Sequence, residues 1–199
     1  MPSHGTDLFA TTYAIDFIAV KDRRTASTKD WRTLLTTEPA ARFFAFGQPI
    51  VAPASGRVVA AHDGETDHAA RRSPPSRVSY ALTQAARARA GAAALAGNHV
   101  IVELEQQRSH VVLAHLRAGS LRVDVGARVV AGQQLAACGN SGNSTQPHVH
   151  IQVMDAADPF TARGLPIAFE NYRVWRRRSR TPVLVDRGIP EEFEVVEPL

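Results

Sequence analysis

The stretch NHVIVELEQQRSHVVLAHL, residues 98–116, contains two runs rich in Val, Ile and Leu, separated by a polar, Gln-rich turn. Runs of about four to eight such residues, bounded by turn residues, predict β-strands. Many short strands at close spacing predict an all-β sandwich or barrel, here with helical insertions. Similar strand-like runs lie at residues 11–20, 50–52, 57–62, 121–130, 133–139 and 148–154.

Two segments interrupt the strand pattern. The apolar spacing of residues 21–46 favours a short helix or a packed excursion. Residues 65–97 form one long insertion, because SPPS breaks the pattern and the Ala-rich residues 77–96 have strong helix propensity. We therefore predict a domain over residues 1–154 that carries both insertions. A C-terminal extension, residues 155–199, is expected to pack on this domain or trail from it, with PVLV and FEVVEP as its strand-like runs.

The composition is that of an ordinary globular protein, with 44% hydrophobic residues in a chain of 199. At this length folding buries most of the chain's surface, so no disulfide or metal is needed to hold the fold, and a bound metal would serve chemistry. Cys138 is the single cysteine, which excludes an intramolecular disulfide and a zinc ribbon. Its apolar flanks predict a small core residue.

The net charge is +4, and nearly all of the positively charged residues are arginines. A modest basic excess suits polyanionic partners without choosing among them. The densest basic run, WRRRSR at residues 175–180, lacks the aromatic and glycine interleaving of nucleic-acid modules, so we predict a solvated tail and no nucleic-acid partner. The sequence has no run of about eighteen apolar residues, so no transmembrane segment is predicted. Its first residues lack the basic-then-apolar pattern that is expected of a secretory signal.

The stretch GNSGNSTQPHVHIQV, residues 139–153, places two histidines one residue apart after a loop rich in turn residues. Because alternate side chains of a strand share a face, His148 and His150 are predicted to point the same way, about 6.6 Å apart along the strand. One imidazole can then bind a metal while the other reaches an atom held beside it. The alternative is a pair of structural or solvent-facing residues, since an HxH pair alone is a weak signal.

Two further ionisable residues, His115 in VVLAHL and Asp16 in YAIDF, lie within apolar strand patterns. Burying a polar group without a partner costs about 1–3 kcal/mol, so a bound cation would explain both residues together with the HxH pair. Hydrolytic zinc sites commonly use three protein ligands and keep a fourth position for water, whose pKa falls to about 7. Nearby histidines can then move its proton and stabilise an oxyanion. His150, Asp16 and His4 would supply a two-histidine, one-carboxylate set.

Several segments, taken in order, resemble the LytM or lysostaphin-type peptidase domain, the M23 family of zinc metallopeptidases. They are SHGTD with YAIDF, PIVAPASGRVVAA, NHVIVELE, VVLAHL and GARVVAGQQLAACGNSGNSTQPHVHIQV. The resemblance runs from about His4 to Val153 and is interrupted by the two insertions. It implies an antiparallel β-sandwich of the lysostaphin type, similar to the duplicated hybrid motif, and one catalytic Zn²⁺ ion. It also implies hydrolysis of peptide bonds in bacterial cell-wall peptidoglycan, in cross-bridges or stem peptides.

Motif matching gives site residues that the resemblance implies: His4, Asp16 and His150 as metal ligands, and His115 and His148 as the pair that assists catalysis. The chain departs from the family pattern in two places. The usual first motif is HxxxD, whereas twelve positions separate His4 from Asp16, so Asp7 in SHGTD is a rival ligand. Gln146 stands where a glycine frequently precedes the Pro of the last motif. No HExxH occurs, so a thermolysin-like mechanism is not indicated.

The remaining histidines have no partner spacing that demands a metal, and surface or hydrogen-bonded roles are expected for them. They are His62, His68, His99 and His110.

Other function classes stay open from the sequence. A second hypothesis is a catalytically silent relative that binds the wall or activates a separate amidase, although no ligand is obviously missing. A third is a phosphocarrier with a phosphoryl group on a histidine, for which Asp16 and His4 would have no use. The family's substrate implies a cell-envelope or extracellular location, and a cytoplasmic location is not excluded.

Overall fold

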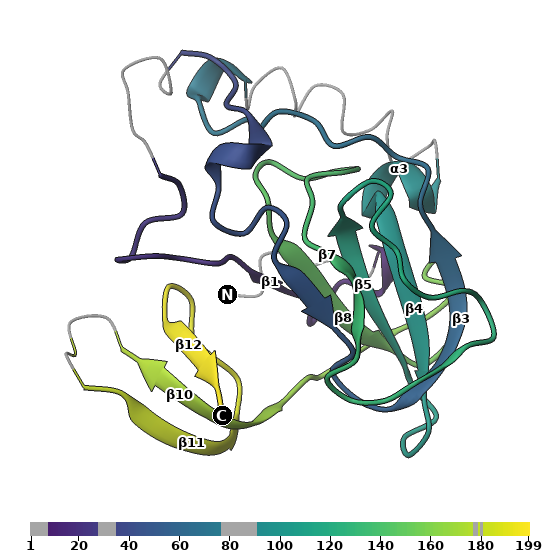
Figure 1. Ribbon diagram of the computed structural model, residues 1–199. Helices are drawn as coiled ribbons and strands as arrows, with labels where there is room; N and C mark the ends of the chain where they lie inside the picture. Colours follow the sequence, from purple (N-terminus) through teal and green to yellow (C-terminus); the bar gives the residue numbers. More distant parts are fainter. Residues whose placement is uncertain (1–7, 28–34, 77–90, 177–178, 180) are drawn as a thin grey trace.

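The computed structural model describes residues 8–27, 35–76, 91–176, 179 and 181–199, and most of its regular structure is antiparallel β-sheet (Figure 1). The mainly β prediction is therefore confirmed. The strands are β1 (Ile15–Phe17), β2 (Pro49–Val51), β3 (Gly56–His62), β4 (Asn98–Leu104), β5 (His110–Leu116), β6 (Arg128–Val129), β7 (Gln134–Ala137), β8 (Val149–Met154), β9 (Gly164–Leu165), β10 (Phe169–Trp175), β11 (Val183–Gly188) and β12 (Val195–Pro198). The helical segments are the 3₁₀ turns η1 (Leu8–Ala10) and η3 (Ala40–Arg42), and the short helix α3 (Ala92–Ala96).

A seven-stranded sheet forms the centre of the fold, with the order β1-β8-β5-β4-β3-β6. The short strands β1 and β9 both pair with β8, β1 against Val149–Ile151 and β9 against its last two residues. Strand β5 lies in the middle, and its residues 111–116 are all buried. This continuous burial explains why HVVLAHL is apolar at both alternating positions, since both faces of the sheet are covered.

One face of this sheet packs against a two-stranded sheet made of β2 and β7. Leu135 of β7 and Ala52 after β2 meet Val100, Val111 and other valines of the large sheet, and all of them are almost fully buried. Cys138, directly after β7, is also buried, which confirms it as a core residue. These two layers form the sandwich that the sequence predicts.

The opposite face of the large sheet has a smaller apolar cluster, which includes Ile101, Val112, Ala114 and Met154. Ala10 of η1 and Ala162 cover part of it. The residues in register with this cluster on β8 are polar, because Ala114 pairs with His150 and Val112 with Gln152. This face therefore contains the histidines.

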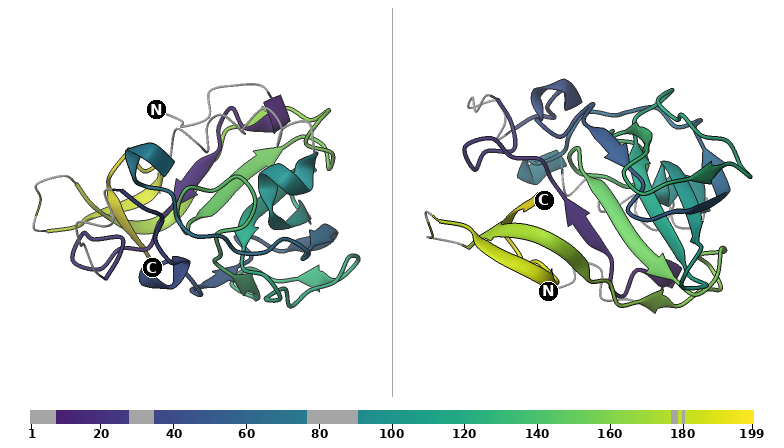
Figure 2. Two further views of the ribbon diagram at one scale, coloured as in Figure 1. Left: turned by 90° about the horizontal axis from the view of Figure 1, so that it is seen from above. Right: turned by 60° about the horizontal axis from the view of Figure 1, so that its bottom comes forward.

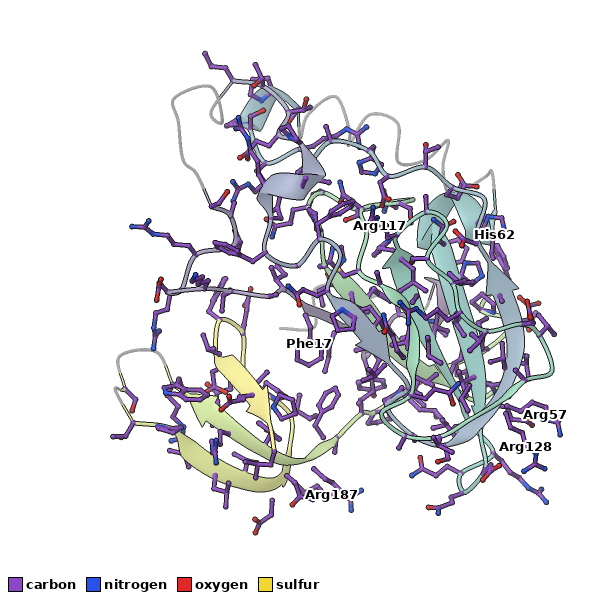
Figure 3. All side chains as sticks on the ribbon, in the orientation of Figure 1. Phe17, Arg57, His62, Arg117, Arg128 and Arg187 are labelled. Atoms are coloured by element: carbon purple, nitrogen blue, oxygen red, sulfur yellow. The ribbon has the colours of Figure 1, made fainter. Side chains whose placement is uncertain are left out.

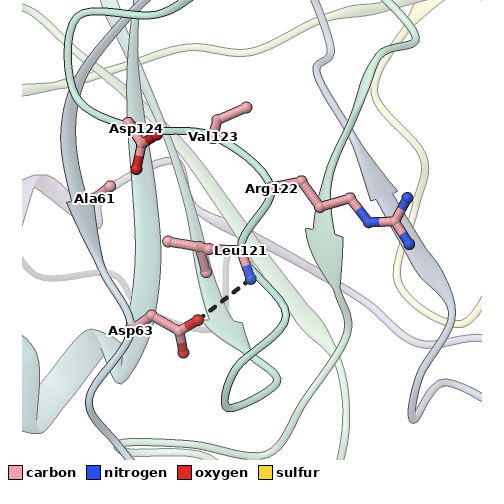
Figure 4. Close-up of a pocket in the computed structure, with 6 residues that line it drawn as sticks. All are labelled: Ala61, Asp63, Leu121, Arg122, Val123 and Asp124. Atoms are coloured by element: carbon pink, nitrogen blue, oxygen red, sulfur yellow. Dashed lines mark hydrogen bonds between the residues drawn. The ribbon is translucent and has the colours of Figure 1, made fainter.

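The segment after β3 forms a strap, residues 63–73, across one end of the sheet. Asp63 accepts hydrogen bonds from the Gly119 and Leu121 amides at 2.8 and 3.3 Å. Figure 4 shows the Asp63–Leu121 bond at a pocket that is lined by Ala61, Asp63, Leu121, Arg122, Val123 and Asp124. None of these six is a predicted site residue. The strap begins the segment that the sequence marks as an insertion.

The other insertion, residues 21–46, contains the turn η3 rather than a longer helix in its described part. Phe43 packs with Ala26 and Ala70 in a small core of its own. Arg72 of the strap stacks over the Phe43 ring at 4.6 Å from the centroid. The same guanidinium donates to both carboxylate oxygens of the buried Glu38, at 2.8 and 3.0 Å. The packed-excursion interpretation fits this arrangement.

Strands β10, β11 and β12 form a separate three-stranded sheet, here called the C-terminal sheet, in the order β11-β10-β12. It lies to one side of the seven-stranded sheet in both views of Figure 2, and the described residues from 8 to 168 are here called the main body. Phe17 of β1 meets Phe169 edge-to-face, with 5.3 Å between ring centroids (Figure 3).

β11 and β12 contain the predicted strand-like runs, whereas β10 was not predicted. The boundary between residues 154 and 155 stays a prediction, and β9 beyond it still pairs with β8. No described helix is long and apolar enough to cross a membrane.

Candidate active site

Asp16 and His150 face each other across the pairing of the edge strand β1 with its neighbour β8. Their Cα atoms are partners in the antiparallel register, so both side chains lie on one face of the sheet. Asp16 Oδ1 is 3.0 Å from His150 Nδ1. The His150 side chain is 9% exposed, whereas 29% of the Asp16 side chain remains accessible. A buried ring and a more open carboxylate therefore lie side by side.

His148 lies directly before β8 and approaches the other oxygen of the same carboxylate. Its Nε2 is 3.5 Å from Asp16 Oδ2. Both histidines of the HxH pair thus contact one aspartate, which confirms the prediction that they share a face. Neither of them is a solvent-facing residue, because each is only 7% exposed. The HxH pair is part of a buried polar cluster.

His115 joins this cluster through an irregularity in β5. Strict alternation would place its side chain on the face opposite Ala114, where Leu113 and Val111 pack. Between β4 and β5, however, the register shifts so that Ala114 and His115 together lie opposite one residue, His99. At this bulge His115 has φ 61°, a left-handed backbone conformation that residues other than glycine rarely adopt. Its ring centroid consequently lies 4.7 Å from that of His148 and 5.9 Å from that of His150.

Each of the three rings is held by a hydrogen bond from its outer nitrogen. His115 Nδ1 donates to Ser141 O at 2.9 Å, and His148 Nδ1 donates to Gln146 O at 2.8 Å. In both cases a carbonyl can only accept, so Nδ1 carries a hydrogen, and in the neutral ring the lone pair is on Nε2. The outer nitrogen of His150, Nε2, faces Gln152 Oε1 at 2.9 Å. The inner nitrogens of His148 and His150 both face Asp16.

The loop after β7 positions His115 through its backbone. Gly139 N donates to His115 O at 3.0 Å, and the Ser141 hydroxyl donates to Leu116 O at 2.8 Å while it accepts from Asn98 N at 3.0 Å. Ser141 and Asn98 are fully buried. These residues were not predicted from the sequence, where the loop residues are ordinary turn formers.

The strap holds the same loop from the other side. Asp67 accepts from Asn140 N at 2.6 Å and from Ala118 N at 3.1 Å, and Asn140 Nδ2 donates to His68 O at 2.7 Å. The predicted insertion therefore contacts the loop that anchors His115. Its role in positioning this loop could not be seen in the sequence, because Asp67 and Asn140 are 73 residues apart.

Burial and the neighbouring charges act differently on two of the rings. Burial lowers the pKa of His115 well below its usual value, and the nearby His148 and His150 lower it further. Burial also acts to lower the pKa of His148, but the hydrogen bond and charge of Asp16 outweigh it, and the pKa of His148 is raised. Two chemically identical rings in one cluster therefore have pKa values that are shifted in opposite directions.

The donor set can be compared with that of a zinc site. Within residues 8–27, 35–76 and 91–199, apart from 177, 178 and 180, no group of three or more His, Cys, Asp or Glu side chains is placed to hold a metal ion. Asp16 and His150 provide two adjacent donors of the kinds that zinc prefers. The predicted third ligand, His4, lies outside the described residues, and so does Asp7, the rival of Asp16.

Three of the remaining histidines, His62, His68 and His99, lie in other hydrogen-bonded environments, whereas His110 Nδ1 is buried without a hydrogen-bond partner among the described residues. His62 and His99 stack on neighbouring strands with ring centroids 5.7 Å apart, and His62 Nε2 is 3.4 Å from Glu65 Oε1. His68 Nε2 lies 3.0 Å from Gly142 O, beside the loop. These contacts agree with the hydrogen-bonded roles expected for them.

Comparison with solved structures finds several peptidases. The catalytic domain of lysostaphin from Staphylococcus simulans is 20% identical over 64% of this chain and 84% of its own, with a TM-score of 0.40. A mutant catalytic domain of the prophage-encoded M23 protein EnpA from Enterococcus faecalis is 19% identical, covering 77% of this chain and 87% of its own, with a TM-score of 0.41. A zinc-containing peptidase from Vibrio cholerae is 20% identical over 60% of this chain and 26% of its own, with a TM-score of 0.37.

The family assignment comes from the sequence match rather than from these overall similarities. Residues 76–162 match the model of peptidase family M23. The matched segment includes His115, His148 and His150, and Asp16 reaches the cluster from the strand that pairs with its end. The match over residues 76–162 therefore supports a peptidase domain of family M23 in this chain.

Proposed function

We propose that the protein is a zinc-dependent metalloendopeptidase that hydrolyses peptide bonds of bacterial cell-wall peptidoglycan. The observation that supports this proposal best is the cluster of Asp16, His115, His148 and His150, in which buried inner ring nitrogens converge beside one carboxylate. A buried cluster of this kind is costly unless it is used, because every unpartnered polar group would lose about 1–3 kcal/mol. The family match supports peptide hydrolysis as that use.

In this proposal Asp16 and His150 hold the zinc ion together with His4. Zinc bound there would act as a Lewis acid and lower the pKa of a bound water towards about 7. The facing pair of Asp16 Oδ1 and His150 Nδ1 suits a cation, since a carboxylate oxygen and an imidazole lone pair are both donors to metals. Asp7 replaces Asp16 in the alternative ligand set.

His115 and His148 are the proposed catalytic pair. Both present Nε2 towards the cluster, because their Nδ1 atoms donate to backbone carbonyls. A fixed lone pair on Nε2 can accept a proton from the attacking water or, once protonated, donate to an oxyanion or a leaving amine. Holding each ring by a main-chain oxygen keeps it oriented during these steps.

The proposed substrate gives the protein a location at the cell envelope or outside the cell. Its C-terminal sheet, within the predicted extension 155–199, would then accompany the peptidase domain to the wall. The proposed partner is therefore the peptide portion of peptidoglycan.

The test is release of peptide fragments from purified peptidoglycan by the zinc-loaded protein, with new amino termini identified by mass spectrometry. His150→Ala is expected to abolish the release and zinc binding together. His62→Ala is the matched control, since His62 lies in β3 away from the cluster and should leave both unchanged. New termini would also identify the bond that is cleaved.

Full activity of the metal-free protein, or of His150→Ala, would overturn the proposal. Zinc binding without any fragment, in the intact protein and the control alike, would favour the catalytically silent wall-binding or amidase-activating alternative.

A further inference from the structure

Gln152 lies next to the proposed ligand His150 and is the polar residue of β8 that the proposed chemistry does not use. It follows His150 by two positions, so its side chain lies on the same face of the sheet. It is 4% exposed, and both ends of its amide are engaged. A buried amide that is satisfied at both ends can act as a rigid connector.

The orientation of the Gln152 amide follows from its partner in η1. Its Nε2 donates to Phe9 O at 2.9 Å, and its second hydrogen points towards Met154 Sδ at 3.8 Å. A reversed amide would bring Oε1 against the Phe9 carbonyl, with no hydrogen between two acceptors. Oε1 therefore faces His150.

This orientation decides which nitrogen of His150 carries the hydrogen. Gln152 Oε1 can only accept, and it lies 2.9 Å from His150 Nε2, so Nε2 must donate. The lone pair of the neutral ring is then on Nδ1, which lies 3.0 Å from Asp16 Oδ1. At this separation a carboxylate oxygen and a lone-pair nitrogen can both bind one cation that lies beside them.

We infer that Gln152 is a positioning residue for the metal centre, which makes His150 a ligand through Nδ1 and links that ligand to the segment following His4. The inference rests on the proposed function. Phe9 follows His4 by five residues in the sequence, so one amide connects the strand of one proposed ligand with the segment that leads from another. Outer hydrogen bonds of this kind typically change metal affinity by about 10–100-fold.

Two substitutions separate the two ends of the amide. Gln152→Leu removes both hydrogen bonds at similar size. Gln152→Glu retains an acceptor for His150 Nε2 but loses the donor to Phe9 O. Gln134→Leu is the matched control, because Gln134 is a partly buried strand residue of β7 whose Nε2 donates to Ala136 O.

Three measurements are made on each protein. They are the zinc dissociation constant by competition with a chromophoric chelator, the visible spectrum of the Co²⁺-substituted protein, and the His150 tautomer by long-range ¹H–¹⁵N NMR of the metal-free protein. Gln152→Leu is expected to weaken zinc binding about 10–100-fold and to lose the Nε2–H tautomer. Gln152→Glu should retain that tautomer, since its carboxylate still accepts from Nε2, and its loss of zinc affinity measures the lost donation to Phe9 O. The control should match the wild type in all three.

Gln152→Leu with wild-type zinc affinity and an unchanged Co²⁺ spectrum would overturn this inference while leaving the proposed function intact. A wild-type protein that binds no zinc would overturn both. If Gln152→Leu does not fold, the tautomer of the wild type decides, because hydrogen on Nδ1 of His150 contradicts the inference directly.

Discussion

The main body and the C-terminal sheet are both antiparallel and both have exposed ion pairs, but the main body also buries a cluster of polar side chains. In the main body His115, His148, His150 and Gln152 are each at most 7% exposed, and each has a hydrogen-bond partner. In the C-terminal sheet charged pairs lie on the surface, for example Arg173 and Glu197, whose side chains are 48% and 53% exposed.

The difference shows where the fold can tolerate change. A buried polar group requires its partner, because leaving it unpaired costs its full desolvation. An exposed ion pair is screened by water and salt and contributes little. Chemistry that needs fixed rings is therefore expected in the main body, while the C-terminal sheet can vary its charged residues without losing its form.

The largest expected contrast concerns thiol reactivity. Burial, assisted by the charge of Asp67, raises the pKa of Cys138 to about 12. Because the thiolate is the reactive form, its population at pH 8 should be about a thousandfold lower than that of an ordinary thiol. We expect Cys138 to resist iodoacetamide in the native protein and react in urea, as followed by mass spectrometry. A cysteine introduced as Leu184→Cys on β11 should react without urea, since that position is 60% exposed. Equal rates at the two positions would break the comparison.

The next contrast is between two leucines. Leu135 of β7 is fully buried between the layers of the sandwich, whereas Leu184 of β11 is 60% exposed. Leu135→Ala is expected to lower the free energy of unfolding by about 3 kcal/mol, from the lost transfer energy and the cavity that remains. Leu184→Ala should stay within about 0.5 kcal/mol of the wild type. Urea unfolding followed by fluorescence measures both, and a larger loss for Leu184 would show that its surface is covered.

The smallest contrast compares two arginine–glutamate pairs. Arg72→Met would leave the buried Glu38 carboxylate without its two hydrogen bonds, at a cost of about 2 kcal/mol, reduced because Arg72 is itself partly exposed. Arg173→Met should change stability by less than about 1 kcal/mol. Urea midpoints give both values.

A double variant sharpens this third test. Replacing Arg72 and Glu38 together by Met should recover most of the stability lost by Arg72→Met, because no buried charge is then left unpaired. A double variant as unstable as the single one would mean that the loss comes from packing on Phe43 rather than from charge.

Much of the strand arrangement can be predicted from the sequence, because apolar runs between turn residues describe β3, β4, β5, β7 and β8 well. Strand length is less predictable. The strand-like run at residues 11–20 contributes only the three residues of β1, since only these pair with β8. In the run 121–130 only Arg128 and Val129 pair, with β3. A strand ends where its partner ends, and the partner is distant in sequence.

The sequence of strand β10 contains a strand pattern, but the arginines that follow it favoured a different prediction. Its sequence FENYRVW alternates, with Tyr172 and Val174 buried and Arg173 exposed between them. The adjacent run of arginines suggested a solvated tail. Of that run, Trp175 belongs to β10 and the exposed Arg176 lies 3.9 Å from Glu194, whereas Arg177, Arg178 and Arg180 lie outside the described residues. Alternation was the better guide there than charge.

The residue types of the site could be predicted from the sequence, but the backbone geometry and the hydrogen-bond partners that position them were harder to predict. His115 stands out in sequence as a polar residue among apolar ones, but its left-handed φ and the bulge that turns its ring depend on the pairing of β4 with β5. Gln152 could have been found, because it occupies the next position on the face of His148 and His150. Asn98 and Ser141 carry no such signal, since their partners are backbone groups brought near only by the fold.

The pairing of β1 with β8 also has a consequence for the order of events during synthesis. Asp16 and His150 are 134 residues apart, and nothing nearer in the chain brings them together. During synthesis Asp16 is made early, but β1 cannot pair with β8 until almost the whole domain has been made. Contacts between residues so distant in sequence form slowly. The domain is thus assembled in an order that leaves its carboxylate and its imidazoles apart until the last strand of the site arrives. The proposed activity would therefore not be possible before strand β8 has been synthesised.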